Sequence, residues 1–308
     1  MQISKLFRNF EKNVTTMMHQ ESRVVEYQHT SNDIEPKTRE YLLEQQLNAA
    51  VRAGAAIMKI YKHSDDYDVE LKSDHTPITI ADRVAHNTIT EALGQTRIPL
   101  RSEEGREMLF DERKNWDMFW LIDPLDGTIE FIKRNNEFTV NIALMADNKC
   151  IGAVVYVPYL GKVYFAEQGG GAMLIQGIEP SESANYSNED IRKQAQTLPL
   201  SSQQHDTFRI AVSRSHQTAE TKEYVDKMRQ KHNDIEVIEQ GSSYKFCLLA
   251  EGAIDYYPRT TTTYEWDTAA AELILVEAGG TVRTLPDHSS LRYNKADLHN
   301  PWFECHRA

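Results

Sequence analysis

Four apolar runs between residues 138 and 175 constrain the fold of this chain more than any other feature of its sequence. They cover 138–145, 150–157, 163–166 and 173–175, and turn-forming residues separate them. Glycine, proline and asparagine between short apolar runs are typical of consecutive antiparallel strands. We therefore predict an antiparallel sheet in the middle of the chain.

Helical patterns precede this sheet. Apolar residues from Leu43 to Met58 form one stripe, which predicts a helix of about six turns that follows Pro36 and packs on a sheet. A second helix is expected to pass Asp82 and to stop at Gly94.

A different pattern follows the sheet. Residues 177–206 are polar and predict a surface loop with one helical turn. From residue 208 to residue 280, strand-like and helix-like segments alternate, which predicts a second lobe of the α/β type. We expect the boundary between the lobes to fall inside the polar loop, giving lobes at 41–180 and 207–308 and a loop at 181–206.

The charge balance excludes one class of function. The 308 residues include 34 Lys+Arg and 46 Asp+Glu, a net charge of −12, so we expect no nucleic acid polymer as a partner. No apolar run approaches the length that crosses a bilayer, and no secretory leader is apparent. The three cysteines are an odd, widely spaced set, which argues against a disulfide framework. We expect a soluble protein of the reducing cytoplasm.

Residues 1–40 differ from the rest of the chain. They contain no glycine and equal numbers of acidic and basic side chains, and the apolar residues between Ile3 and Met17 recur at helical spacing. One interpretation is an amphipathic helix in residues 1–18 that contacts a partner or the cytoplasmic face of the inner membrane. We favour the other, a helix packed on its own protein or a disordered arm.

The most informative motif is the segment from Asp123 to Thr128, Asp-Pro-Leu-Asp-Gly-Thr. An apolar run, 118–122, delivers Asp123 and Asp126 into a turn, and Gly127 lets the backbone pass close to a ligand. Paired carboxylates suit hard cations such as Mg²⁺, and amides after Gly127 suit a phosphate group. The alternative interpretation is an ordinary surface turn.

Other acids stand at comparable places. Glu103 and Glu104 follow the apolar run 98–100, Asp82 lies in the first turn of a predicted helix, and Asp267 precedes another. Taken singly, each has an ordinary explanation: a solvated loop, a helix-dipole charge, or a helix cap.

Taken together, these segments resemble the inositol monophosphatase superfamily of Mg²⁺-dependent, lithium-sensitive phosphatases. The resemblance covers about residues 41–305. It is carried by Ser-Glu-Glu at 102–104, Trp120 to Thr128, Glu-Trp-Asp-Thr-Ala-Ala at 265–270 and Glu-Ala-Gly-Gly at 277–280. Residues 127–135, 137–144, 213–216, 241–248 and 257–259 are most similar to its branch of 3′(2′),5′-bisphosphate nucleotidases, whereas the inositol enzymes tend to carry Thr-Asn-Phe-Val-His after the Gly-Thr.

The resemblance implies a fold and a reaction. The fold would be a two-lobed, layered α-β-α-β-α sandwich, with metal binding in the first lobe and nucleotide selection in the second. The reaction would remove the 3′-phosphate of adenosine 3′,5′-bisphosphate, giving AMP and phosphate in sulfur metabolism, and the phosphosulfate analogue is a further candidate substrate. Two or three Mg²⁺ ions would be required.

The resemblance also assigns roles to residues. The implied metal ligands are Glu103, Asp123, the Leu125 carbonyl, Asp126 and Asp267. Glu103 and Thr128 would hold the nucleophilic water, and Asp82 would orient the Thr128 hydroxyl. Lys72 would be a nearby positive group. Implied substrate contacts are Gly127, Thr128, His216, Ser242, Lys245, Arg259 and Asp267.

Some interpretations stay open. For Lys245 the alternative is a solvated helix face, for His216 an ordinary residue near a helix cap, and for Lys133 and Arg134 a plain surface pair, which we favour. The chain departs from the family pattern at Ile129, at Ala271 and in the four threonines 260–263. The last departure affects the expected fit of the nucleotide.

Three alternative functions remain. An inositol phosphatase or a sugar-bisphosphate phosphatase would use the same metals and water. A nucleotide-binding or metal-binding regulator would keep the fold without turnover, and a scaffold attached through residues 1–18 would not need the acids at all. The oligomeric state is not determined by the sequence.

Overall fold

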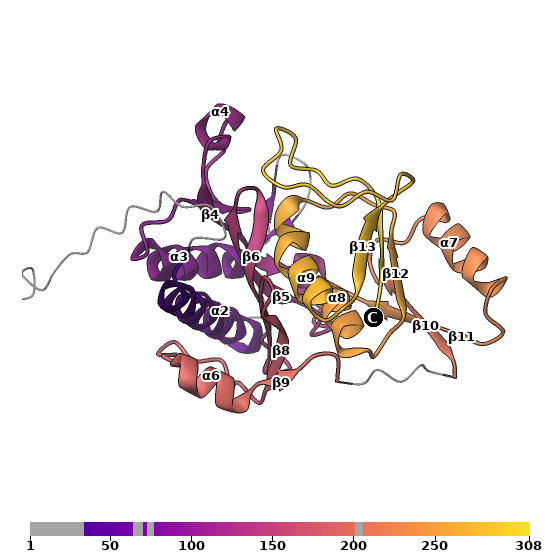
Figure 1. Ribbon diagram of the computed structural model, residues 1–308, viewed down its shortest axis with the longest axis horizontal. Helices are drawn as coiled ribbons and strands as arrows, with labels where there is room; N and C mark the ends of the chain where they lie inside the picture. The colour runs from indigo at the N-terminus through magenta and orange to yellow at the C-terminus, as the bar shows by residue number, and fades with distance from the viewer. Residues whose placement is uncertain (1–33, 64–69, 73–76, 201–205) are drawn as a thin grey trace, which may run out of the picture.

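Two β-sheets alternate with three layers of helices (Figure 1). The computed structural model describes residues 34–63, 70–72, 77–200 and 206–308. In order, the layers are helices α2 and α3, a seven-stranded sheet, helices α8 and α9, a five-stranded sheet, and helix α7. The predicted α-β-α-β-α sandwich is confirmed.

The larger sheet contains the predicted meander. Its strand order is β3-β4-β5-β6-β7-β8-β9, and all neighbours are antiparallel except β3 and β4. The strands are β3 Leu100–Ser102, β4 Met118–Asp126, β5 Thr139–Ala146, β6 Lys149–Val157, β7 Lys162–Glu167, β8 Gly171–Gln176 and β9 Gln196–Thr197. The predicted polar loop contains the expected helical segment, α6 Asn188–Gln194, which is longer than one turn, and also the edge strand β9, which was not predicted.

Helices α2 Pro36–His63 and α3 Ile80–Gly94 cover one face of this sheet. Their apolar stripes pack on the alternate strand residues that point to this face of the sheet, such as Trp120 and Ile122 in β4. Helix α2 is longer than predicted, and Ile34 before it is already buried. The helix therefore begins four residues before residue 40, the expected end of the arm.

Helices α8 Tyr244–Glu251 and α9 Glu265–Glu277 form the middle layer. They pack on the other face of the larger sheet, through side chains such as Phe119 and Leu121, and on the five-stranded sheet as well. Because this layer is shared, a residue in the first turn of α9 lies close to both sheets.

The five-stranded sheet has the order β11-β10-β12-β14-β13. The parallel part was predicted, but the two antiparallel strands at the end of the chain were missed. The strands are β10 Phe208–Ser213, β11 Ile235–Gln240, β12 Tyr256–Arg259, β13 Thr281–Thr284 and β14 Phe303–His306, and α7 Ala219–Arg229 covers the outer face.

Three short elements complete the described chain, apart from α5, which belongs to the site below. Strands β1 Glu70–Leu71 and β2 Pro77–Ile78 form a small ladder, and α4 Phe110–Arg113 projects from the edge beside β4 (Figure 1).

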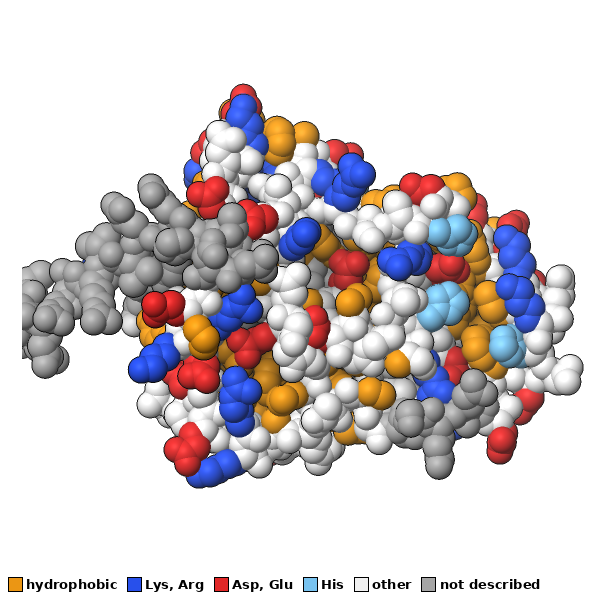
Figure 2. Space-filling model, viewed as in Figure 1, with side chains coloured by type: hydrophobic (Ala, Val, Ile, Leu, Met, Phe, Trp, Pro, Cys, Tyr) orange, Lys and Arg blue, Asp and Glu red, His pale blue; other side chains and the backbone are white. Residues whose placement is uncertain are grey.

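No helix in the described ranges is long and apolar enough to cross a membrane. The expected amphipathic segment, residues 1–18, lies outside them. On the face seen in Figure 2, basic side chains stand at separate positions among acidic and apolar ones, in agreement with the net charge of −12.

The packing of α2 on the sheet generates a stability prediction. A methyl group added at Gly54 would overlap the ring of Tyr156, which is fully buried and donates a hydrogen bond to the Ile178 carbonyl. Gly54→Ala should therefore lower the free energy of unfolding by about 1–2 kcal/mol, despite the higher helix propensity of alanine. At Gly94, a methyl group would meet no atom within 4 Å, so Gly94→Ala is the matched control. Urea unfolding in which Gly54→Ala is as stable as Gly94→Ala would contradict the prediction.

Candidate active site

A bulge in β4 places the first two acids on one face of the sheet. Asp123 pairs with Asn141 of β5 and Asp126 pairs with Thr139, so the three-residue step in β4 opposes a two-residue step in β5. In a regular strand, residues three apart point to opposite faces. The extra residue in the bulge turns Asp126 to the side of Asp123, toward the middle helical layer.

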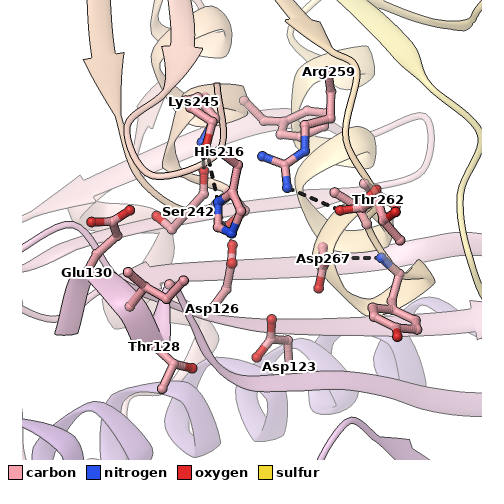
Figure 3. A pocket seen from close by; sticks show the side chains of 18 of the residues that line it. Asp123, Asp126, Thr128, Glu130, His216, Ser242, Lys245, Arg259, Thr262 and Asp267 are labelled. Carbon is pink, nitrogen blue, oxygen red and sulfur yellow. Dashed lines mark hydrogen bonds between the residues drawn. The ribbon is translucent and has the colours of Figure 1, made fainter. Parts of the chain in front are cut away.

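Two more acids come from separate elements. Glu103 follows β3, the parallel neighbour of β4, and its N–H donates to the Ile122 carbonyl at 3.0 Å. Asp267 lies in the first turn of α9. All four acids line one pocket. Figure 3 shows three of them, Asp123, Asp126 and Asp267. The predicted convergence of acids that are distant in sequence is therefore present.

Backbone amides orient three of these carboxylates. Asp123 Oδ1 accepts the N–H of Leu125 at 3.0 Å, and Asp267 Oδ2 accepts that of Tyr264 at 2.8 Å. Asp126 Oδ2 accepts the N–H of Ser243. One oxygen of each acid is thus held by the chain itself, which fixes the direction of the other.

Burial and mutual repulsion disfavour the charged forms of the acids in this pocket. Burial raises the pKa of Asp123 well above its usual value, and the charges of Glu103, Asp126 and Asp267 raise it further. Burial also raises the pKa of Asp267, with Asp126 and Glu103 as the next causes. The pKa of Glu103 rises to about 7, mainly through burial. Such a site favours a cation.

Lys72 is a positive group in contact with Glu103, one of these acids. Its Nζ lies 2.6 Å from Glu103 Oε1 and 2.5 Å from Glu104 Oε1. Burial opposes the charge of Lys72, but the two carboxylates outweigh it and raise its pKa. Lys72 thus neutralises the edge of the acid cluster.

The acids fit a divalent ion by chemistry more than by their present spacing. Carboxylates and the Leu125 carbonyl are oxygen ligands of the kind that Mg²⁺ accepts. Within the described ranges, however, no three His, Cys, Asp or Glu side chains already form a group that could hold an ion.

The expected pair of Asp82 and Thr128 is formed. Thr128 Oγ1 donates to Asp82 Oδ1 at 3.0 Å. Asp82 is buried in the first turn of α3, where its other oxygen accepts the N–H and the hydroxyl of Thr79 at 2.7 and 2.6 Å. This capping box explains its place in the sequence and also fixes the oxygen that faces Thr128.

Gly127 links the acids to the short helix α5 Thr128–Ile132. Its φ of 93° lies in the left-handed region, and a Cβ there would stand 2.9 Å from the Glu137 carbonyl oxygen. Only glycine fits both requirements. The turn therefore brings Thr128 into the pocket directly after Asp126.

The second lobe supplies the opposite wall of the pocket, with Ser242, Lys245, Arg259 and His216 (Figure 3). Lys245 is 2% exposed and its Nζ donates to the carbonyls of Gln240 and Ser242 at 3.0 and 2.6 Å, so the solvated-helix interpretation was wrong. Burial, with the charge of Arg259 as the next cause, lowers its pKa to about 7.

Arg259 and His216 also face the pocket. The Arg259 Nη2 donates to the Thr262 carbonyl at 3.2 Å, while its Nε is buried without a partner. Burial lowers the pKa of His216. The threonine loop at 260–263 thus contributes directly to the wall, because Thr262 and Thr263 line it.

Lys133 and Arg134 do not line this pocket. Lys133 Nζ contacts Ser215 Oγ at 3.0 Å on an exposed surface, and the guanidinium of Arg134 lies over the ring of Tyr61. The surface interpretation that we favoured agrees with these positions.

Several lining residues had no role in the sequence analysis, among them Glu130, Ser243 and Tyr264. Ser243 and Tyr264 act through backbone amides, which carry no side-chain signal in a sequence. Glu130 lies two residues beyond Thr128 and is buried, a position that only the packing of α5 against the second lobe reveals.

Comparisons with known proteins agree with this geometry. The model of the inositol monophosphatase family matches residues 38–301. A 3′(2′),5′-bisphosphate nucleotidase CysQ of Escherichia coli O6:H1 is 40% identical over 247 residues, which are 78% of this chain and 89% of that protein. The same-named protein of Haemophilus influenzae is 37% identical over 270 residues, 86% of this chain and 92% of that protein.

Solved structures extend the likeness to three dimensions. The crystal structure of CysQ from Bacteroides thetaiotaomicron superposes with a TM-score of 0.80 at 42% identity, covering 87% of this chain and 97% of that one. An inositol monophosphatase of Thermotoga maritima shares the fold, with a TM-score of 0.63 at 21% identity, covering 86% of this chain and 92% of that one. The chain belongs to the inositol monophosphatase family. Membership supports a divalent metal at the acid-lined pocket.

The Asp82–Thr128 pair generates a kinetic prediction. Thr128→Val keeps the shape of the side chain but removes the hydroxyl, so turnover of a phosphate monoester substrate should fall at least about 100-fold. Thr128→Ser should retain most of the rate, because it keeps the hydroxyl. Steady-state rates measure both variants, and thermal melting checks that each is folded. Equal rates for the valine and serine variants would show that the hydroxyl has no part in the reaction.

Proposed function

We propose that this protein is a Mg²⁺-dependent 3′(2′),5′-bisphosphate nucleotidase, which hydrolyses the 3′-phosphate of adenosine 3′,5′-bisphosphate to AMP and phosphate. The observation that carries the proposal is the meeting of Glu103, Asp123, Asp126 and Asp267 in one pocket beside the Asp82–Thr128 pair. Sequence identity of about 40% to proteins named for this activity supports the choice of substrate.

The metal ligands in this proposal are Glu103, Asp123, the Leu125 carbonyl, Asp126 and Asp267, and two or three Mg²⁺ ions are the expected number. When bound, such ions supply Lewis acidity that neutralises phosphate charge and makes water a stronger nucleophile. The backbone N–H groups of Leu125, Ser243 and Tyr264 keep the carboxylates in place as that charge develops.

The protein orients the attacking water through Thr128 and Glu103. The Thr128 hydroxyl donates a hydrogen bond to Asp82, and its lone pairs therefore stay available as acceptors for a ligand in the pocket. A water that donates to Thr128 and Glu103 has its own lone pair directed at phosphorus. Asp82 is a positioning residue in this scheme, since it acts only through Thr128.

The wall of the second lobe selects the nucleotide. Arg259 has a buried Nε without a protein partner and carries a fixed positive charge, which suits a second phosphate group. Ser242 and His216 lie nearby and offer neutral hydrogen bonds. Lys245 is held by two carbonyls, so we assign it chiefly to the shape of the 240–242 turn.

A panel of substrates tests the function. Phosphate release from adenosine 3′,5′-bisphosphate should exceed that from inositol 1-phosphate and fructose 1,6-bisphosphate, because only the nucleotide offers both a ribose ester and a phosphate for Arg259. Release should require Mg²⁺ and decline with Li⁺. Faster release from the inositol or sugar substrate would replace the proposal with the corresponding phosphatase, and no release from any substrate would favour a binding protein.

Removing single acids tests the ligand set. Asp123→Asn and Asp267→Asn should each lower turnover more than about 100-fold through loss of a metal ligand. Without metal, both variants should melt no lower than the original protein, because each removes a carboxylate whose charge the folded state opposes. Asp226→Asn, on the exposed side of α7, is the matched control for both measurements. A large drop in melting temperature with little loss of rate would make these acids structural.

A further inference from the structure

Glu130 is a buried carboxylate in the pocket that the proposed reaction does not use. It lies in α5, is 3% exposed, and lines the pocket together with the metal-ligand candidates. It is separate from the acids of β4 and α9, because its side chain points toward Ser242 at the wall of the second lobe (Figure 3). A buried acid in this position needs a donor.

The chain holds Glu130 from two sides. Asn135 Nδ2 donates to Glu130 Oε2 at 2.5 Å. Across the pocket wall, a Cβ at Gly241 would stand 2.5 Å from Glu130 Cγ, so the absence of a side chain at 241 makes room for the acid. Glu130 is therefore positioned by contacts from both lobes.

The chemistry of a carboxylate limits what it can bind. It accepts hydrogen bonds and repels phosphate groups, so its ligand is a neutral donor of the substrate. The positive group suited to a second phosphate, Arg259, comes from β12 on the far side of the pocket (Figure 3). The pocket thus separates the places for the two phosphates from a place for an uncharged hydroxyl group.

The position of Glu130 identifies which hydroxyl. It lies two residues beyond Thr128 in the same short helix, and both residues line the pocket in which the ester would bind. In a ribose phosphate, the donor nearest the ester is the hydroxyl on the adjacent carbon. We propose that Glu130 accepts a hydrogen bond from this vicinal ribose hydroxyl, and so makes the enzyme selective for ribonucleotides; this rests on the proposed function.

The test compares adenosine 3′,5′-bisphosphate with its 2′-deoxy counterpart in the presence of Mg²⁺. For the unmodified protein, kcat/KM should be at least about tenfold higher for the ribonucleotide, the effect of one hydrogen bond to a charged group. Glu130→Gln should reduce this ratio several-fold and Glu130→Ala should bring it near one. The loss should appear in KM for the ribonucleotide and leave the deoxy substrate within about twofold.

Two further variants sharpen the result. Asn135→Ala removes the anchor of Oε2 and should also lower the ratio. Glu189→Gln makes the same charge change on the exposed surface of α6 and should leave the ratio unchanged.

An unchanged ratio in both Glu130 variants, or an equal loss on both substrates, would overturn the inference and leave the nucleotidase function standing. If the unmodified protein hydrolysed neither nucleotide but did hydrolyse inositol 1-phosphate, the proposed function itself would fail, and this inference with it.

Discussion

Repulsion among carboxylates that share one pocket is the constraint on which the surrounding structure depends. Asp123, Asp126 and Asp267 are each tied to a backbone N–H, and Glu103 is paired with Lys72. These contacts offset part of the cost, but burial and the neighbouring charges still raise the pKa of Asp123 and that of Asp267. A cation can relieve the remaining imbalance, so the pocket is costly without a divalent ion and favourable when one is bound.

The shared helical layer explains how such a pocket is assembled. Because α8 and α9 pack on both sheets, the first turn of α9 and the residues before α8 reach the end of β4. At the rim, Arg214 of the second lobe donates to both carboxylate oxygens of Glu137 at 2.8 and 2.7 Å, and Glu137 also accepts the N–H of Gly241. The two lobes are thus joined beside the site, and residues of both line the pocket.

Much of this arrangement was predictable, and the failures have physical causes. The meander and the long helices were found because their apolar periodicity is strong. Strands β9, β13 and β14 were missed because they are short and are defined by their partners, with little pattern of their own. The acids and the Asp82–Thr128 pair were anticipated from motif and resemblance. The two backbone carbonyls that hold Lys245 and the burial of Glu130 were not.

By itself, the sequence determined which chemistry was available: the acid pair around Pro124, the glycine that follows it, and the alternation that builds the sheets. Only the tertiary structure decided which side chains meet. The bulge in β4 turns Asp126 to the face of Asp123, and the middle layer brings Asp267 beside them. Strand register and helix packing set these relations through contacts between segments far apart in the chain, and a linear pattern carries no information on such distances.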